Sequence, residues 1–451
     1  MKRYPSYQST NGIIEVEFPE SWQKSRLRFI GNLYGGLTGK AGNDFNDLGH
    51  PNNRSFIPFT NVFKNTYINT DDLQFVKIQE GERQNEVRKG DLFFLMSSEG
   101  REDLGKCSLL NDDLNSVYLN SFCKGFRVSR DDFDPKYLNY LLFGDIHRNL
   151  ISIEGRGFTR INLRQESLLN ALILKPSIEE QTQIARYLDY KTAKIDALIE
   201  KKQRLIDLLE EERTAIINQA VTKGLNPNVP MKDSGIEWLG EIPEHWEIMR
   251  ISLISNYLSY GFTNPMPTTS QGPYMLTAND IKDGFIDYEN ARRTEQDAYD
   301  NLLTKKSKPF LKDILITKDG TLGRVAICDR EDVCINQSVA VIRVDPDKLI
   351  PDLLLHFLRA SYYQTKMEFD AGGTTIKHIY ITRLAKMKVA FPIEKKEQER
   401  LLFAIEERIK SHDKKLSAIR REVELLQEYR TALISEVVTG KVDVRDEVIP
   451  E

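Results

Sequence analysis

The sequence is poor in the residues that build metal sites and disulfides. Its 451 residues include only four cysteines and six histidines. The histidines form no HExxH or similar pairing, which argues against a metal centre or a histidine-activated nucleophile. The cysteines lie in strand-like contexts, without the CxxC pairs of a zinc site, so we expect buried thiols at Cys107, Cys123, Cys328 and Cys334.

Long apolar runs and an excess of positive charge are also missing. No run approaches the roughly 20 apolar residues of a membrane span. The opening MKRYPSYQSTNGIIEV lacks the apolar core and small-residue cleavage site of a secretory signal, so we expect a cytoplasmic protein with no membrane partner. The net charge of −4 and the pI near 6.0 weaken a nucleic-acid interpretation unless basic residues gather locally.

Two stretches resemble enzyme motifs but fail on inspection. GGLTGKAG would need glycine at Tyr34 and serine or threonine at Ala41 to form a phosphate-binding loop. NPMP at Asn264 to Pro267 has Met266 in place of a proline and Pro267 in place of the aromatic residue that would stack on a flipped base. We therefore expect a loop there and no catalysis by this chain.

The strongest positive feature is a long internal repeat. Gln181 to Thr222 aligns without a gap to Gln398 to Thr439, a displacement of 217 residues (398 − 181), and the two segments end in RTAIINQAVT and RTALISEVVT. Such a period is far longer than the roughly 20 to 50 residues of a solenoid repeat. It indicates two duplicated globular domains, each followed by a long helix.

Shorter correspondences precede each helix and indicate mixed α and β structure. Glycine turns are expected near Gly36 and Gly261, followed by short apolar strands. Helices should begin at Pro135 and Pro351, where a missing amide proton costs nothing. Other matched pairs are Pro19 and Pro243, Trp22 and Trp246, Gly100 and Gly320, Asn120 and Asn336, and Arg127 and Arg343.

Two of these pairs allow more than one interpretation. Trp22 and Trp246 could stack on bases, but their place just before a strand favours packing at the entrance of each domain. Asn120 and Asn336 could read adenine or cap a turn, and the sequence favours neither.

Each long helix, of about 40 residues and some 60 Å, repeats apolar positions in steps of three and four. Two ordinary amphipathic helices are the alternative, but the length favours a coiled coil. Polar residues at seam positions should set register and orientation. We expect antiparallel pairing, with the domains at opposite ends of a rod and a pseudo-twofold axis between them. The seam runs through Leu188, Thr192, Ile195, Ile199, Lys202, Ile206, Leu209, Arg213, Ile216 and Ala220, and through Ile405, Ile409, His412, Leu416, Ile419, Val423, Leu426, Arg430, Leu433 and Val437.

The expected fold is therefore α+β, with two similar mixed α/β domains and two long helices forming an antiparallel coiled coil. We place the boundaries at 1–176 for the first domain, 177–226 for the first helix, 227–392 for the second domain, 393–440 for the second helix and 441–451 for a C-terminal tail.

Basic residues gather locally, next to glycines, despite the acidic total. Glycine lets backbone amides approach phosphates, and hydroxyl, amide and basic side chains contact phosphates or base edges. The alternative is that the glycines only make turns and the charges only face solvent. Our candidates for DNA contact are Ser97, Ser98, Arg101, Arg156, Thr159 and Arg160 in the first half, and Thr317, Lys318, Asp319, Gly320, Thr321, Arg324, Thr374, Thr375 and Lys377 in the second.

Three stretches resemble the specificity subunits of type I restriction-modification systems. KDSGIEWLGEIPEHW, from Lys232 to Trp246, is similar to the opening of a target recognition domain in that family. PSIEEQTQIARYLD and PIEKKEQERLLFAI are similar to its helical regions, and the resemblance covers the whole chain. The first domain departs from the pattern, because it opens with NGIIEVEFPESW and carries an insert, GKAGNDFNDLGHPNNRS, without a counterpart.

The resemblance implies a non-catalytic chain that reads a split double-stranded DNA target, one part per target recognition domain, across an unread gap. It implies two methylation subunits, carrying S-adenosylmethionine, docked on the helices, and ATP-driven restriction subunits in the larger complex. The chain itself would hold no cofactor. The alternative is a coiled-coil scaffold whose domains bind other proteins, which would suit the acidic net charge.

Overall fold

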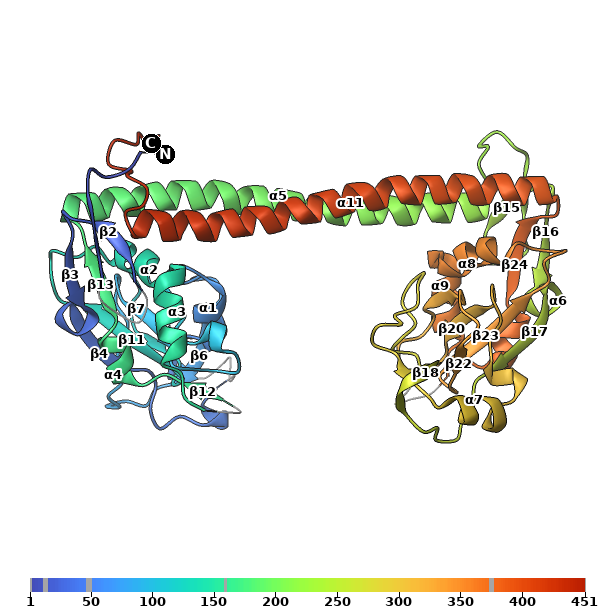
Figure 1. Cartoon of the computed structure of the whole chain (residues 1–451), viewed down its shortest axis with the longest axis horizontal. Helices are drawn as coiled ribbons and strands as arrows, with labels where there is room; N and C mark the ends of the chain where they lie inside the picture. Colours follow the sequence, from blue (N-terminus) through green and yellow to red (C-terminus); the bar gives the residue numbers. More distant parts are fainter. Residues whose placement is uncertain (1, 11–14, 46–50, 158–159, 373–376, 451) are drawn as a thin grey trace. The chain divides into compact units, whose positions relative to one another are not determined.

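The computed structural model describes residues 2–10, 15–45, 51–157, 160–372 and 377–450. It divides into two compact units, one of residues 1–202 with 421–451 and the other of residues 203–420. Each unit contains one globular domain and a stretch of both long helices (Figure 1). No helix of the described chain is long and apolar enough to cross a membrane.

The first unit is built around a four-stranded sheet of order β4-β11-β7-β9 and a three-stranded sheet of order β10-β5-β6. Its strands are β1 (Tyr7–Ser9), β2 (Glu17–Pro19), β3 (Gln23–Arg26), β4 (Gly31–Gly35), β5 (Asn53–Ile57), β6 (Gln74–Lys77), β7 (Leu92–Leu95), β8 (Ser97–Ser98), β9 (Cys107–Leu109), β10 (Val117–Leu119), β11 (Cys123–Val128), β12 (Ile161–Asn162) and β13 (Leu172–Lys175). Its shorter helices are α1 (Phe59–Lys64), α2 (Pro135–Phe143), α3 (Asp145–Ile153) and α4 (Gln165–Leu169).

The second unit repeats this arrangement, with sheets of order β17-β23-β20-β21 and β19-β18-β22. Its strands are β14 (Met231–Asp233), β15 (Glu241–Pro243), β16 (Trp246–Arg250), β17 (Ser255–Tyr260), β18 (Thr269–Leu276), β19 (Arg292–Arg293), β20 (Ile314–Thr317), β21 (Val325–Ile327), β22 (Val333–Ile335), β23 (Val339–Val344) and β24 (Lys388–Pro392). Its shorter helices are α6 (Ile251–Ile254), α7 (Gln296–Leu302), α8 (Pro351–Arg359), α9 (Ser361–Asp370) and α10 (Ile381–Lys386).

Local sequence explains where the matched helices begin and end. Both α2 and α8 start at a proline, as predicted, and the Asp134 side chain caps the amides of Lys136 and Tyr137. The long helices α5 (Ile178–Lys223) and α11 (Lys395–Val438) are followed by Gly224 and Gly440, at φ of +72° and +73°. Only glycine adopts this left-handed conformation without strain, so it ends each helix, within one residue of the matched place.

The predicted glycine turns near Gly36 and Gly261 are positions of close backbone contact. A Cβ on Gly36 would lie 2.1 Å from the carbonyl oxygen of Asn120, and one on Gly261 would lie 1.8 Å from that of Ile335. Glycine is therefore required because the end of one strand passes directly over another strand's backbone.

Within each unit the two long helices run antiparallel. Asp196 pairs with Arg430 at 2.8 Å in the first unit, and further along the same two helices Lys202 pairs with Glu422. In the second unit Arg213 lies 3.3 Å from Asp413. The predicted antiparallel pairing is confirmed.

Every seam position predicted from the heptads is buried or half-buried. Lys202, Arg213, His412 and Arg430, the basic residues of the seam, lie within 4.0 Å of an acid on the other helix, with His412 facing Glu212 at that distance. These ion pairs explain how polar groups are tolerated in the seam and why they favour one helix orientation.

The core of each unit joins the domain to its helices. In the first unit Leu188 and Val437, both fully buried, pack in one cluster with Tyr137 and Leu141. In the second unit Val221 and Ile405 pack with Trp246 and Phe357. The helices are therefore part of the hydrophobic core of the domains.

The segment after α11 also belongs to the first unit. Val444 is fully buried, and the amide of Asp443 donates to the carbonyl of Lys2 at 2.9 Å. Figure 1 accordingly shows the two ends of the chain next to each other.

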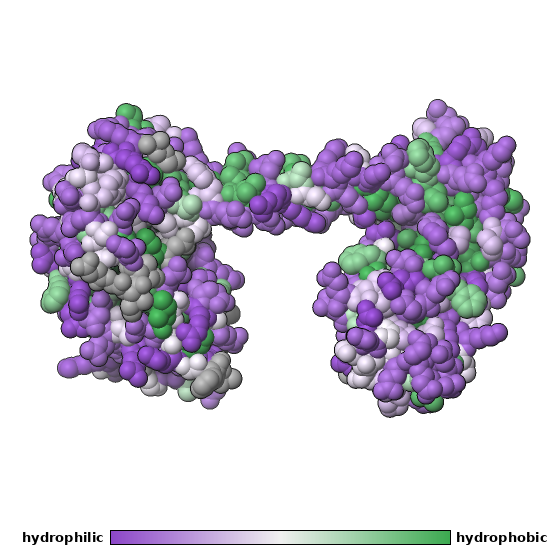
Figure 2. Space-filling model, in the orientation of Figure 1, coloured by the Kyte–Doolittle hydropathy of each residue, from purple (hydrophilic) through white to green (hydrophobic). Residues whose placement is uncertain are grey.

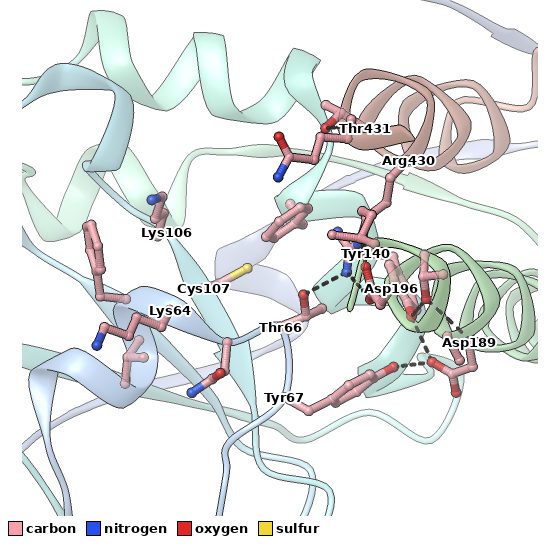
Figure 3. Close-up of a pocket in the computed structure, with 18 residues that line it drawn as sticks. Lys64, Thr66, Tyr67, Lys106, Cys107, Tyr140, Asp189, Asp196, Arg430 and Thr431 are labelled. Carbon is pink, nitrogen blue, oxygen red and sulfur yellow. Dashed lines mark hydrogen bonds and ion pairs between the residues drawn. The ribbon is translucent and has the colours of Figure 1, made fainter. Parts of the chain in front are cut away.

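A cavity of about 780 Å³ separates part of the first domain from its helices (Figure 3). Tyr67 and Tyr140 point toward Asp189 of α5 and donate hydrogen bonds to its carboxylate. Arg430 of α11 reaches Asp196 and the hydroxyl of Thr66. Polar contacts around the cavity thus hold the domain on the helix pair.

Candidate nucleic-acid interface

In the first domain, the structure brings together candidate residues that lie far apart in the sequence. β8, which consists of Ser97 and Ser98, pairs antiparallel with β12, so that Ser98 faces Ile161 and Ser97 faces Asn162. Arg156 forms a further bridge with Asn162. Two predicted segments, 97–101 and 156–160, therefore meet on one surface.

The arginines of this surface face solvent. Arg101, Arg156 and Arg160 are all exposed. The Arg101 guanidinium donates to the carbonyl of Ser152 at 3.4 Å, and that of Arg160 lies 5.8 Å from the ring centre of Phe122. Exposed guanidinium groups are the donors that contact phosphates or guanine.

One candidate of the first domain does not fit this description. Ser98 is buried, and its hydroxyl donates to the carbonyl of Gly100, so its side chain holds the local turn. Thr159 lies outside the described residues.

The second domain makes the corresponding pairing at the corresponding place. Asp319, just beyond β20, forms an antiparallel bridge with His378, and Gly372 forms another with the same residue. The amide of Ile379 donates to the carbonyl of Lys318 at 2.9 Å. The two basic, glycine-containing segments of this half are therefore neighbours, as in the first domain.

Charge at this pairing is partly neutralised. Lys318 contacts Asp319 at 2.9 Å, and the carboxylate of Asp319 also contacts the ring of His378. The Lys318 ammonium lies 5.4 Å from the ring centre of Tyr260, and that of Lys306 lies 5.6 Å from it. Asp319 thus orients the basic groups around it.

The hairpin from Thr317 to Arg324 encloses two of the predicted side chains. Thr317 is fully buried, and its hydroxyl accepts from the amide of Arg324 at 2.9 Å. Lys318 is also buried, at 6% exposure. Both side chains hold the hairpin because they lie at the end of a core strand, so neither offers a free surface. Gly320 and Thr321 are exposed at its tip.

The other candidates of the second half have mixed positions. Lys377 is exposed and Arg324 is half-buried. Thr374 and Thr375 lie outside the described residues.

The paired tryptophans pack inside their domains, as predicted. Trp22 is 2% exposed and donates to Glu180 of α5 at 3.0 Å, and Trp246 is fully buried and donates to Glu397 of α11 at 3.1 Å. Neither is available to stack on a base.

The asparagine pair caps turns through the side-chain oxygens, which is one of the two roles that the sequence left open. The Asn120 carboxamide oxygen accepts from the amide of Phe122 at 2.9 Å, and that of Asn336 accepts from the amide of Ser338 at 3.0 Å. Each turn joins two strands beside the candidate surface.

The cysteines are buried and unpaired, as expected, and burial raises the thiol pKa of Cys107, Cys123 and Cys334 to about 12 and that of Cys328 to about 11. Among the described residues, His, Cys, Asp and Glu side chains form no group of three or more that could hold a metal.

Sequence reasoning missed three residues of the two candidate surfaces: Phe122 in the first domain, and Tyr260 and His378 in the second. Phe122 is 57% exposed and Tyr260 is 39% exposed. For Phe122 and Tyr260, the only sequence feature that could have indicated a place on the surface is a matched neighbour. Phe122 follows Asn120 by two positions, and Tyr260 precedes Gly261. Exposure of an aromatic side chain cannot be deduced from such spacing.

Comparison with known proteins places both halves in one family. The family model described as "Type I restriction modification DNA specificity domain" matches residues 19–208 and again residues 243–425. The specificity subunit of the MjaX type I restriction enzyme from Methanocaldococcus jannaschii is 26% identical over 441 residues, covering 95% of both chains. The specificity subunit of the EcoBI enzyme from Escherichia coli is 25% identical over 401 residues, covering 87% of this chain and 80% of that one.

Solved structures share the fold at low identity. A chain from work on complex assembly and conformational transition of the type I R-M system aligns with a TM-score of 0.67 at 16% identity, over 94% of this chain and 99% of that one. The HsdS subunit from Thermoanaerobacter tengcongensis aligns with a TM-score of 0.50 at 17% identity, over 94% and 98%. Because the family model covers most of the chain in two copies, the chain belongs to the DNA specificity subunits of type I restriction-modification systems.

Proposed function

We propose that this chain reads a bipartite double-stranded DNA target, one part with each globular domain, and leaves a gap of unread base pairs between them. The chain catalyses nothing itself. Two methylation subunits that carry S-adenosylmethionine dock on its helices, and ATP-driven restriction subunits join the larger complex.

One observation carries this proposal: the candidate surface is built twice by the same backbone pairing. Ser97 with Asn162 in the first domain and Asp319 with His378 in the second occupy matched strand ends. Each pairing lies inside one of the two segments that match the DNA specificity family. The side chains differ between the two surfaces, so the two halves of the target need not be alike.

Exposed leucines on the helices support the proposed protein partners. Leu198, Leu205 and Leu208 of α5 are 42%, 44% and 54% exposed. Figure 2 shows hydrophobic residues along the helices, within a surface that is otherwise mostly hydrophilic. Apolar residues at spacings of three and seven suit the addition of further helices.

Exchanging one domain tests the division of labour. Residues 231–392 would be replaced by the matched segment of a related specificity subunit, and the modified sites mapped across the host genome. We expect one half of the target to change and the other half to persist. A change of both halves, or of neither, would contradict the assignment of one half-site to each domain.

Salt dependence separates DNA reading from the scaffold alternative. Contacts to phosphates release counterions, so affinity for the target duplex should fall steeply between about 50 and 200 mM salt, by roughly a thousandfold for six contacts. An affinity for duplex that hardly changes with salt, or no affinity at all, would favour domains that bind proteins.

A further inference from the structure

A pocket of about 470 Å³ lies on the candidate surface of the first domain. Ser97 and Arg160, both predicted to contact DNA, form part of its lining. The remaining lining includes an aromatic wall of Phe59, Phe63 and Phe122. The rings of Phe59 and Phe63 are stacked with their centres 6.2 Å apart, and Phe122 stands exposed at the rim.

Polar groups complete the pocket. The carboxamide oxygen of Asn120 is held by the amide of Phe122, whereas no hydrogen bond among the described residues uses its nitrogen. That nitrogen is a donor available to a ligand. Glu99 is exposed and supplies an acceptor, while Asp103 is paired with Lys106 at 2.6 Å.

The second domain has the same backbone frame with different side chains. The amide of Asn120 donates to the carbonyl of Ile57, and the amide of Asn336 donates to that of Leu276, both at 3.0 Å. The position of Phe122 is taken by Ser338, whose hydroxyl donates to the Asn336 side chain and accepts from the amide of Ala278. The aromatic wall is therefore specific to the first domain. A residue that makes the two half-sites different must itself differ between the two domains.

We propose that this pocket recognises a thymine of the first half-site through its major-groove edge. An adenine–thymine pair presents there an amino donor on adenine, the O4 acceptor and the 5-methyl group of thymine. Glu99 accepts from the amino group, Asn120 donates to O4, and Phe122 with the aromatic wall contacts the methyl group. Arg160, beside Phe122, positions the adjoining phosphate. The inference rests on the proposed function, because it names what one recognition surface reads.

Deoxyuridine tests the methyl contact, because it differs from thymidine only by that group. The full-length chain, in complex with its methylation subunits, would be titrated with target duplexes in which each thymine of the first half-site is replaced singly. We expect one position at which the replacement lowers affinity about fourfold, the factor for losing one buried methyl group. Phe122→Ala should bind both duplexes equally.

A matched control is available in the same unit. Phe29 is 63% exposed, so Phe29→Ala removes a similar surface ring. This variant should keep the preference for thymine over deoxyuridine. Equal binding by the wild type at every position, a first half-site without thymine, or a preference that persists in Phe122→Ala would each overturn the inference.

The same titration distinguishes failure of the inference from failure of the proposed function. A wild-type complex that binds its target in a sequence-specific and salt-sensitive way, but ignores the methyl group, refutes only the thymine pocket. A complex that does not prefer any duplex refutes both. Because Phe122 is exposed, its truncation leaves the core intact, and circular dichroism of the variant checks this.

Discussion

The two units keep the same contacts where each long helix begins and where each domain is entered. Gln181 and Gln398 are both fully buried, and each side chain bonds three backbone groups of its own domain. The tryptophan–glutamate contacts and the Arg127–Asp91 and Arg343–Asp313 pairs are also repeated. The glutamine and tryptophan contacts join each domain to the start of a long helix, and the arginine–aspartate pairs join strands within the domain, so both the attachment and the sheet contacts are repeated.

At other matched positions of the core, the two units place different side chains. Tyr140 of α2 corresponds to His356 of α8, whereas His147 of α3 corresponds to Tyr363 of α9. All four side chains are at most 6% exposed. One tyrosine and one histidine thus fill each interior, in exchanged positions. The comparison shows that the contacts between each domain and its long helix constrain the sequence more strongly than the packing of these core side chains does.

Breaking the arginine–aspartate pairs should have the largest effect. Arg343 bonds both oxygens of Asp313, which is 1% exposed and otherwise accepts from the amide of Phe310. Arg343→Ala leaves a buried carboxylate almost unpaired and should lower the local free energy of unfolding by about 3 to 5 kcal/mol. Hydrogen exchange read by mass spectrometry reports each unit separately.

The matched substitution Arg127→Ala should cost less, because Asp91 keeps two further donors. Its carboxylate accepts from the Tyr34 hydroxyl at 2.5 Å and from the amide of Arg88 at 2.8 Å. An equal or larger loss of stability in the first unit would show that these two donors do not stabilise the Asp91 carboxylate.

The buried glutamines should give equal effects in the two units. Gln181→Leu and Gln398→Leu each remove three hydrogen bonds to buried or half-buried backbone groups. At roughly 1 kcal/mol for each group left unpaired, each variant should lose about 3 kcal/mol in its own unit. If the two variants changed hydrogen exchange at the starts of α5 and α11 by unequal amounts, the two domains would not be attached to their helices in the same way.

Acid should destabilise both units through their exchanged histidines. Burial lowers the pKa of His147 to about 4, and burial together with the charge of Arg359 lowers the pKa of His356 to about 4. The unfolded chain takes up a proton as the pH falls below about 6.5, whereas the folded chain does so only near pH 4. The neutral forms therefore stabilise the fold above pH 6.5, and this contribution is lost as the pH falls toward 4.

From pH 7 to pH 5 each unit should lose about 2 kcal/mol from its histidine. His147→Tyr places the residue of the second unit in the first, and His356→Tyr does the reverse. Each variant should flatten the pH dependence of exchange in its own unit and leave the other unit unchanged. A dependence that persists in both variants would assign the acid sensitivity to other groups.

Local and periodic features were predictable from the sequence. The repeat, both long helices, the proline starts of α2 and α8 and the seam all depend on residues close together in the chain. Even the polar seam residues were identified, since a heptad assigns each position a face.

The geometry of the candidate surface was only partly predictable. The segments 97–101 and 156–160 were each selected for their composition, but their pairing depends on contacts across about 60 residues, which no local pattern contains. Thr317 was selected for its hydroxyl, and the sequence did not show that a hydroxyl at the end of this core strand points inward and closes a hairpin. Phe122 was missed because burial of an aromatic side chain is the usual expectation.

The smallest effect tests matched acids on the two long helices. Asp189 of α5 accepts from the hydroxyls of Tyr67 and Tyr140 (Figure 3), and it also accepts from Lys136 at 3.0 Å. Its counterpart on α11 is Glu406, whose pKa is raised by partial burial and by the nearby charge of Asp352. Asp189→Asn keeps an oxygen for the two hydroxyls, which both donate to Oδ1, but it places an amide donor where Oδ2 accepts from the Lys136 ammonium. It should therefore lower the stability of the first unit by about 1 kcal/mol. Glu406→Gln removes a charge that its surroundings disfavour, so the second unit should stay within about 0.5 kcal/mol or become slightly more stable. Hydrogen exchange along α5 and α11 measures both effects. If the two substitutions changed stability in the same direction, the two acids would have the same role, and the contacts of Asp189 beside the cavity would not stabilise the attachment of the first domain to its helices.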